Sequence, residues 1–313
     1  MAITSSAGYP QYSGNIITPE FSDEMLVHFY EASVFANIST TEYSGQITNM
    51  GDSVTFFREP DIQIRPYQKG QKLQFDQPTF EPVTMTVDRA NYFGFHFDDI
   101  DQHQLGPKYP KITSRLAQAA AYRQQRILDR QMLMHIWSEA DAQNRGAAAG
   151  ASSGTFNLGV TGAPIVVSTS TVTEILTRPQ AVLHEAEVPS TMGRPFLILP
   201  HIAHHILLNS DLRNSDISGQ HPLMTGGFTQ RRYAEFDLYF TNQCPVVIDP
   251  SLSVPCYQVL AGYQMATAFC AQIQKTESTG VEDGFGQKTK GLFVYGFKTL
   301  YPKAIASLYV RFS

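Results

Sequence analysis

The feature that most constrains the fold is a long stretch of helical periodicity that begins at Pro110 and continues to about Asn144. About 33 residues at 1.5 Å each would span roughly 50 Å, three times the mean length of a helix in a globular domain. The next glycine, Gly146, suits the left-handed cap at which helices often end. One apolar line runs along the stretch, through Ile112, Leu116, Ala119, Ala120, Ile127 and Met134. The chain is therefore expected to contain one helix of unusual length.

The first half of this predicted helix is basic, with cations at Lys111, Arg115, Arg123, Arg126 and Arg130. Such a face is more often simply solvated than used for binding, although contact with a polyanion inside a container would need the same residues. Arg123 interrupts the apolar line, and its long side chain is expected to carry its charge out to water.

An arm and a short helix are expected before the long helix. Residues 1–19 carry no charged side chain and show no period, which is typical of an extended arm or of a disordered tail. From Phe21 to Ile38 apolar residues recur at helical intervals, with Ser22 as a plausible start. No secretory signal and no membrane-spanning run is recognisable, so a soluble protein is expected.

The next segment predicts a long hairpin. The stretches "SVTFF", "DIQIRPY" and "KLQF" alternate apolar and polar residues, and Gly70 in "QKGQ" allows a tight reversal. A further strand pattern, "VTMTVDRANYFGFHF", places Phe93, Phe95 and Phe97 on one face. Prolines remove backbone donors, so these strands are expected at an edge or in a projecting arm, given Pro60, Pro66, Pro78 and Pro82.

A second unit is expected after the Gly/Ala/Ser-rich segment 146–164. Helical and strand patterns alternate in it: a helix at 171–187, a strand at Pro195–Leu199, a helix at His201–Asn209, a glycine turn at Thr225–Phe228 and a strand at Asp237–Asn242. From Tyr263 the chain returns to strand patterns, in "YQMATAFCAQIQKTES", "GLFVYGFKTL" and "PKAIASLYVRF". The predicted fold class is α+β.

Composition excludes several kinds of protein. The 313 residues are 42% hydrophobic and only 16% charged, against about 25% charged in a typical soluble domain. A surface so poor in charge favours extensive contact with partners. The net charge of −5 argues against a protein that mainly coats nucleic acid. Three cysteines without metal or disulfide spacing fit a reducing cytoplasm: Cys244, Cys256 and Cys270.

Three histidines lie within five positions in "PHIAHHILLNS": His201, His204 and His205. On a helix, His201 would share a face with either of the others, as metal ligands can. No HExxH pattern occurs and the nearest carboxylate is Asp211, so packing or capping at a subunit surface is favoured over a metal site. The sequence also has no nucleophile elbow, Walker loop or dinucleotide fingerprint. No catalytic residue, metal or cofactor is predicted.

Two runs, "LTRPQAVLHEAEVPSTMGRPFLILPHIAHHILLNS" and "LMTGGFTQRRYAEFDLYFTNQCP", resemble the A-domain of tailed-bacteriophage major capsid proteins of the Hong Kong 97 type. The pattern is a helix, "VP..GR", a strand ending in proline, a helix, and a strand ending in "TNQ.P". The segment "ITPEFSDEMLVHFYEASVFANI" resembles the N-arm and its helix, "GDSVTFF" with the hairpin resembles the E-loop, and residues 110–144 resemble the P-domain spine helix. The closing strands are similar to those that complete the P-domain. The resemblance covers nearly the whole chain in the right order.

This resemblance implies a Hong Kong 97-type fold with the following division: N-terminal arm 1–22, N-terminal helix and lead-in 23–51, E-loop hairpin 52–88, P-domain with spine helix 89–150, A-domain 151–260 and C-terminal P-domain strands 261–313. It also implies a structural protein of the virion and not an enzyme, assembled in the host bacterial cytoplasm into hexamers and pentamers of an icosahedral shell. Expected partners are further copies of the chain, a separate scaffolding protein, a portal, a decoration or cement protein, and packaged double-stranded DNA bound without sequence specificity. No membrane is involved.

Two groups of residues carry the contacts that the resemblance implies. In the hairpin, Arg65, Lys69 and Lys72 are candidate contacts between subunits. On the long helix, the candidate internal DNA contacts are Arg115, Arg123, Arg126 and Arg130. Some family members crosslink a lysine of this hairpin to an asparagine of a neighbouring P-domain, but no partner asparagine can be identified here, so no crosslink is predicted.

Two other interpretations stay open. One is an encapsulin, a bacterial nanocompartment shell of the same fold that encloses a cargo enzyme. The other is a metal-dependent α/β enzyme that uses His201, His204 and His205, which stoichiometric metal in the purified protein would reveal.

Overall fold

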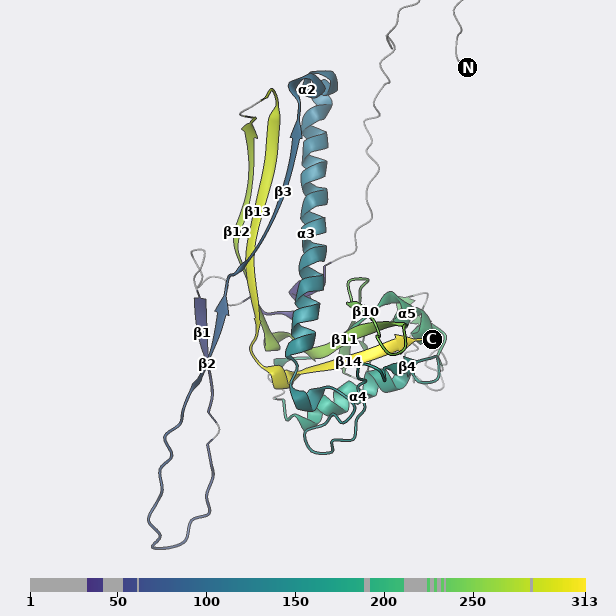
Figure 1. Cartoon of the computed structure of the whole chain (residues 1–313). Helices are drawn as coiled ribbons and strands as arrows, with labels where there is room; N and C mark the ends of the chain where they lie inside the picture. Colours follow the sequence, from purple (N-terminus) through teal and green to yellow (C-terminus); the bar gives the residue numbers. More distant parts are fainter. Residues whose placement is uncertain are drawn as a thin grey trace, which may run out of the picture.

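The computed structural model describes residues 33–41, 53–60, 62–188, 192–210, 224–225, 228–229, 232–233, 235–281 and 284–313. The fold is α+β. A long helix and a narrow sheet rise side by side from a compact α/β unit, and a hairpin projects from their junction toward the opposite end of the molecule (Figure 1).

The longest element is α3, Tyr109–Glu139, a helix of 31 residues that follows the short helix α2, Asp99–Leu105. A narrow antiparallel sheet runs beside α3 in the order β12-β13-β3, with β12 at Thr267–Gly280, β13 at Gln287–Thr299 and β3 at Arg89–Phe97 (Figure 1). Tyr295 Oη on β13 donates a hydrogen bond to Gln131 Oε1 on α3 at 2.5 Å, which joins the sheet to the helix.

The predicted long helix is confirmed, but its predicted end is wrong. Helix α3 stops at Glu139 and not near Asn144, because Ala140 adopts an extended ψ of 143°. Asp141 then caps a separate 3-10 turn, η3, which spans Ala142–Asn144. Gly146 does have a positive φ of 89°, but this glycine lies in the turn beyond and caps no helix.

The predicted apolar line of α3 is wrong in its second half. Ile127 and Met134 are 44% and 48% exposed. The side chains that α3 buries have the usual spacing of a helix stripe but are offset by one or two positions from the predicted line: Leu128, Met132, Leu133 and Ile136.

The face of the narrow sheet toward α3 is aromatic, as the alternation on β3 predicts. The ring centroids of Phe93 and Phe95 lie 6.3 Å apart, and those of Phe95 and Phe97 lie 6.0 Å apart. The Phe93 ring covers Gly291 of the paired strand, where a Cβ atom would lie 2.2 Å from the ring. An aromatic side chain thus fills the space that the glycine leaves.

The hairpin begins as two short antiparallel strands, β1 at Ser53–Arg58 and β2 at Glu81–Thr86. Their inward side chains pack on the face of the narrow sheet opposite α3, in a small cluster built around Met85, Val87 and Val294. The hairpin base is therefore fixed to the sheet.

The predicted strands "DIQIRPY" and "KLQF" are wrong, because the described residues 62–80 contain no strand. Between these two arms, the only backbone hydrogen bond among described residues closes the tip, from Gln71 N to Gln68 O at 3.0 Å. Proline residues withhold backbone donors along both arms, which accounts for the missing ladder.

The compact unit is a sheet of seven strands in the described chain, ordered β4-β14-β11-β5-β9-β8, with β10 also pairing with β11. Its strands are β4 Ile165–Val167, β5 Pro195–Leu199, β8 Arg232–Tyr233, β9 Phe236–Phe240, β10 Val246–Ile248, β11 Pro255–Tyr263 and β14 Ile305–Phe312. Helices α4 Val172–Glu185 and α5 His201–Leu208 complete it. The predicted alternation of strand and helix is confirmed in this unit.

Two details of this unit differ from the expectations. Strand β14 pairs with β11 and β4, so residues 261–313 do not form one set of strands beside α3. The predicted glycine turn at Thr225–Phe228 is flanked by two-residue strands β6, Met224–Thr225, and β7, Phe228–Thr229, while its glycines lie outside the described residues.

Most of the predicted N-terminal region also lies outside the described residues, including the arm 1–22 and the start of the helix at Ser22. The described part begins at Ser33 and contains one helical turn, α1, Phe35–Ile38. Asp129 of α3 holds this turn: its carboxylate accepts hydrogen bonds from Ser33 Oγ at 2.8 Å and from the Phe35 N–H at 3.1 Å.

Candidate interaction surfaces

The hairpin tip brings together two of the three predicted contact residues, Lys69 and Lys72. Gly70, with φ at +88°, forms the reversal, and Lys69 and Lys72 are exposed on either side of it. Arg65 lies further from the tip and points across the hairpin, where its guanidinium donates to Asp76 Oδ1 at 2.7 Å and to the Gln74 carbonyl at 3.4 Å. Arg65 therefore joins the two arms, a role that sequence reasoning missed, while the lysines present charge at the tip.

The arms of the hairpin expose an unusual amount of apolar surface. Ile64 is 95% exposed and Phe75 is 88% exposed. Other large apolar side chains of the hairpin are also exposed: Phe57, Ile62, Tyr67, Leu73 and Phe80. Large apolar side chains exposed in such number on one hairpin are typical of an interaction surface in a soluble protein.

The base of the hairpin is held by a side chain as well as by packing. The Arg58 guanidinium donates two hydrogen bonds to the Leu300 carbonyl, at 3.0 and 2.7 Å. Its Nη1 atom also lies 3.7 Å from Glu81 Oε2. The projecting arms therefore start from a fixed point.

A second surface is the basic face of α3, which we define as Lys111, Arg115, Arg123, Arg126 and Arg130. All but Arg115, which is partly buried, are exposed. With its amide oxygen turned toward the helix, Gln243 accepts hydrogen bonds from Arg126 Nε and Nη2 at 3.1 and 3.2 Å. This surface runs along the helix, far from the hairpin tip, so the two predicted groups of residues form separate surfaces (Figure 1).

The three histidines lie on α5, as predicted, but only two of them lie near each other, because the His205 ring lies 3.3 Å from Asn209 Nδ2 instead. The rings of His201 and His204 both pack near Phe240, with centroid distances of 6.4 and 4.8 Å. Burial, and then the charge of His201, lower the pKa of His204. In the described part of the chain, no three His, Cys, Asp or Glu side chains lie close enough together to hold a metal ion.

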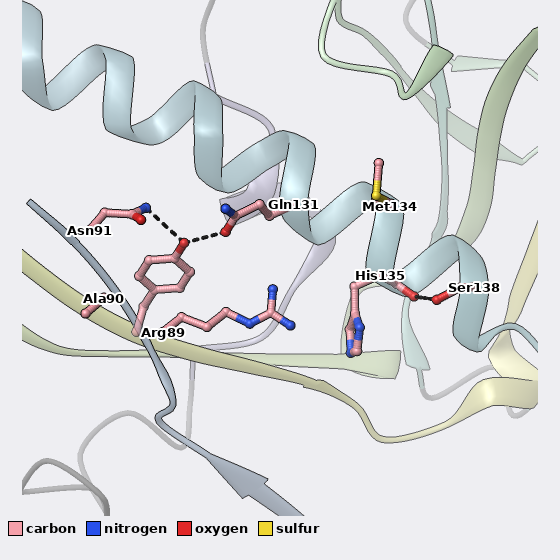
Figure 2. A pocket seen from close by; sticks show the side chains of 8 residues that line it. Arg89, Ala90, Asn91, Gln131, Met134, His135 and Ser138 are labelled. Carbon is pink, nitrogen blue, oxygen red and sulfur yellow. Dashed lines mark hydrogen bonds between the residues drawn. The ribbon is translucent and has the colours of Figure 1, made fainter. Parts of the chain in front are cut away.

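A groove of about 660 Å³ lies between α3 and the narrow sheet, and no sequence pattern predicted it. Its lining includes Arg89, Asn91, Gln131, His135 and Tyr295. The Tyr295 hydroxyl accepts a hydrogen bond from Asn91 Nδ2 at 3.0 Å and donates one to Gln131 Oε1 at 2.5 Å. Figure 2 shows Asn91 and Gln131 on opposite sides of this groove. Burial raises the pKa of Tyr295, which favours the protonated phenol that donates to Gln131 on the helix.

The groove is not arranged for nucleophilic catalysis. Ser138 Oγ donates to the main-chain oxygen of His135 at 2.7 Å and not to its imidazole (Figure 2). The His135 ring packs on Phe297 and lies 3.3 Å from Glu139. A nucleophile needs a base within hydrogen-bond reach, which Ser138 lacks in this arrangement.

The outer face of the narrow sheet, opposite α3, is a further surface that sequence reasoning missed. Strand register places Lys275, Leu292 and Tyr92 in one row and Glu277 and Lys290 in the next. Tyr92 is 83% exposed. Beyond the hairpin base this face is exposed, and Lys275 and Lys290 lie in the same two rows as the ring of Tyr92 and its neighbours. The three strands had been predicted, but their register, which gathers these residues, could not be read from the sequence.

In the residues that the structure describes, no helix has both the length and the apolar character needed to cross a membrane.

Comparison with known proteins gives similarity of structure only. No protein-family model matches the sequence, and no curated protein is a significant sequence match. A chain from Mycobacterium phage Che8 has 19% identity and a TM-score of 0.72, over 94% of this chain and 97% of that chain. A chain of the cyanophage P-SCSP1u capsid has 15% identity and a TM-score of 0.67, over 96% and 94%. A chain of the mature capsid of bacteriophage PhiM1 has 15% identity and a TM-score of 0.64, over 95% and 92%. The chain thus shares its fold with phage capsid structures along almost its entire length.

Proposed function

We propose that this chain is the major capsid protein of a tailed double-stranded DNA phage, with the Hong Kong 97-type fold. The observation that carries the proposal is the match to capsid chains from end to end, with over nine-tenths of each chain covered. Such a protein assembles into hexamers and pentamers that tile an icosahedral head. Its role is structural and not enzymatic, and it resides in the virion.

The hairpin supports this proposal on physical grounds. A single subunit exposes the apolar side chains of these arms to water, which is unfavourable. Holding the arms in one conformation without a backbone ladder also costs chain entropy. Contact with a neighbouring copy would cover them. Repeated head-to-tail contacts that close by rotation produce rings, the arrangement of capsomers. We assign Lys69 and Lys72 to this contact, with Arg65 holding the arms in position for it.

We assign the domains from the resemblance and adjust one boundary. Residues 1–22 are the N-arm, 23–51 the lead-in, 52–88 the E-loop and 89–150 the first part of the P-domain. Residues 151–260 are the A-domain, to which β14 is added because it pairs with β11 and β4. The remaining P-domain strands are β12 and β13.

The basic face of α3 is assigned to non-specific contact with packaged DNA. Arginine side chains neutralise phosphate charge without reading sequence. Charge reversal at Arg115, Arg123, Arg126 and Arg130 should impair DNA filling but leave shell formation intact. Normal filling in that variant would refute the assignment.

A scaffolding protein, a portal and a decoration or cement protein are proposed as partners, with assembly in the host cytoplasm. The solved structures described above come from phages, which favours a viral shell over an encapsulin. An α/β enzyme built on His201, His204 and His205 has no support from the arrangement on α5.

The test is sedimentation velocity and electron microscopy of the recombinant protein, with and without a scaffold encoded by a neighbouring gene. Closed shells, open sheets or rings of five and six copies would support the capsid function. DNA inside the shells would indicate a virus, and an enzyme inside them an encapsulin. A monomer or dimer under every condition, particularly one with stoichiometric metal, would overturn the proposal.

A further inference from the structure

Strand β3 forms a free edge of the narrow sheet. The sheet order is β12-β13-β3, and no strand of the described chain pairs with the outer side of β3. Over its nine residues, Arg89–Phe97, the strand contains no proline and no carboxylate, and its first residue is its only Lys or Arg. The other edge strand, β12, carries Lys275 and Glu277, charges of the kind that protect an edge from pairing. The edge of β3 lacks this protection and is therefore open to a further strand.

An exposed apolar flank of α3 lies beside this edge. Met134 lines the groove described above together with residues at the start of β3, so both face the same space. A helix advances by about 100° per residue, so Leu116, 18 positions before Met134, points the same way, and Ile127 points within about 20° of it. Ile127 and Met134 are 44% and 48% exposed. Arg123 and Arg130 also project from this flank, and their long side chains can carry the charge out to water. The exposed part of the predicted apolar line thus runs beside the open edge of β3.

The second arm of the hairpin, Gln71–Gln77, has the pattern of a strand but no strand partner. Leu73 and Phe75 alternate with polar residues and are 62% and 88% exposed. The arm contains no proline, whereas Pro66 interrupts the first arm. Apart from the bond that closes the tip, no backbone–backbone hydrogen bond of the described structure involves this arm. Its backbone N–H groups are thus available for pairing with the edge of a sheet.

We infer that the second arm of one copy adds to the free edge of β3 in another copy as an antiparallel strand. The inference rests on the proposed function, because it requires a second copy. In Figure 1 the hairpin extends away from the narrow sheet toward the opposite end of the molecule, so the arm does not reach β3 of its own chain. Arm and edge also match in length, because the arm has seven residues and β3 has nine.

The alternation of the arm determines its register on β3. Side chains that lie directly opposite each other on adjacent strands share a face of the sheet. The aromatic residues of β3 face α3, so Phe75 belongs opposite Phe95, and Leu73 then lies opposite Phe97. In this register the apolar side chains of the arm are covered by the exposed flank of α3, and the polar side chains remain on the outer face. An aromatic pair between strands adds to the stability of the contact.

Charge complementarity fixes the direction of the arm. In the antiparallel register the hairpin tip, with Lys69 and Lys72, lies just beyond the end of β3, at the start of α2. This part of the chain carries three carboxylates: Asp98, Asp99 and Asp101. A parallel arm would instead bring the two lysines toward Arg89 at the start of β3. Opposite charges favour the antiparallel arm, and like charges oppose the parallel one.

The pairing is tested by a disulfide between copies, in a variant with Gln74→Cys and His96→Cys. The register places these two positions opposite each other, where Cα atoms about 4.5–5.5 Å apart allow a disulfide. The control variant carries Gln74→Cys and Thr279→Cys. Thr279 is exposed and lies in the same row as His96, but on β12, three strand spacings or about 14 Å from the added arm. The three native cysteines are buried.

Both variants are assembled into shells, oxidised and analysed on a non-reducing gel. The test variant should form covalent multimers in most subunits, and the control less than about one-tenth as many. Unassembled subunits of the test variant should form none, since the arm does not reach its own β3. Shells in which the test variant crosslinks no more than the control would overturn the inference and leave the capsid function standing. Failure to assemble under every condition, in wild type as well, would overturn both.

Hydrogen exchange of the wild-type protein distinguishes a paired strand from simple proximity. The amides of Leu73–Gln77 have no backbone acceptor in the described subunit and should exchange at least about tenfold more slowly in shells than in free subunits. A crosslink without slower exchange would show that the arm lies beside β3 but is not a strand of the sheet, which would refute the pairing.

Discussion

A Cβ atom placed on Gly296 would lie 2.3 Å from the carbonyl oxygen of Thr86. Thr86 is the last residue of β2, and Gly296 lies on β13, so the hairpin base crosses the narrow sheet in direct backbone contact. No side chain other than hydrogen fits between them. The direction in which the hairpin leaves the sheet therefore depends on this glycine.

Gly296→Ala should loosen the hairpin base. The added methyl group must displace β2 or strain β13, at a cost of about 1–3 kcal/mol. The free energy of unfolding in urea measures this cost, and faster tryptic cleavage at Arg65 and Lys69 would locate it in the hairpin. Gly280→Ala is the matched control, because nothing lies within 4 Å of a Cβ at Gly280. Equal destabilisation in both variants would show that the crossing is not the cause.

Arg65 and Asp76 connect the two arms of the hairpin through an ion pair of 2.7 Å that is exposed to solvent. Arg65→Ala should change subunit stability by less than about 0.5 kcal/mol, because exposed pairs contribute little. Assembly should nevertheless slow by about tenfold, since the arms lose a constraint that prepares them for binding. Light scattering during assembly measures the rate.

The charge swap Arg65→Asp with Asp76→Arg is the control for this effect. It restores the pair with reversed polarity and should recover most of the assembly rate. Unchanged assembly in Arg65→Ala would contradict the role of the pair. Failure of the swap alone would show that the arginine, and not the pair, is needed.

Glu139 is the last residue of α3, and two charged or chargeable side chains lie next to its carboxylate. Its carboxylate lies 2.7 Å from Lys298 Nζ and 3.3 Å from the His135 ring. Burial raises the pKa of Glu139, but hydrogen bonds from His135 and Lys298 outweigh burial and lower the pKa from 4.5 to about 2. The folded state thus prefers the ionised carboxylate.

A depressed folded pKa stabilises the protein above the unfolded pKa of 4.5, and this contribution is lost as the pH falls toward 2. Glu139→Gln should therefore lower the free energy of unfolding by about 2 kcal/mol at pH 7, and by much less at pH 3. Urea unfolding at both pH values measures the difference. Glu277→Gln is the control, because its carboxylate pairs with lysines on the exposed outer face. A Glu139→Gln deficit that is the same at pH 3 and pH 7 would rule out the ionisation as its cause.

The sequence predicted those parts of the fold that depend on local patterns. The helix α3, the strand β5 at Pro195–Leu199 and the aromatic alternation of β3 follow from periodicity. Errors arose where a distant contact decides the outcome. The chain leaves the helix at Ala140, and Asn144 then donates to the carbonyls of Lys303 and Ile305, which no local pattern reveals.

The candidate surfaces were predictable to a similar extent. Lys69 and Lys72 could be placed at a tip because a glycine lies between them. The role of Arg65 could not be predicted. The periodic pattern of apolar residues indicated paired strands, whereas the structure has two arms that the Arg65 side chain joins. The placement of β14 also escaped the sequence, since strand periodicity identifies a strand but not its neighbours.

The last prediction concerns Asp129, whose buried carboxylate accepts hydrogen bonds from Ser33 Oγ and from the N–H groups of Val34 and Phe35. Asp129→Asn keeps the shape but replaces one acceptor oxygen with an NH₂ group that faces donors. Hydrogen bonds to a charged group contribute about 1.5–3 kcal/mol, and an unsatisfied buried donor adds a further penalty. Asp129→Asn should therefore reduce the free energy of unfolding by about 3 kcal/mol. Ser33→Ala removes one donor and creates no unsatisfied buried donor, so it should lower the free energy of unfolding by only about 1 kcal/mol. Urea unfolding ranks the two variants, and an Asp129→Asn loss no greater than that of Ser33→Ala would show that the two N–H groups do not depend on the carboxylate.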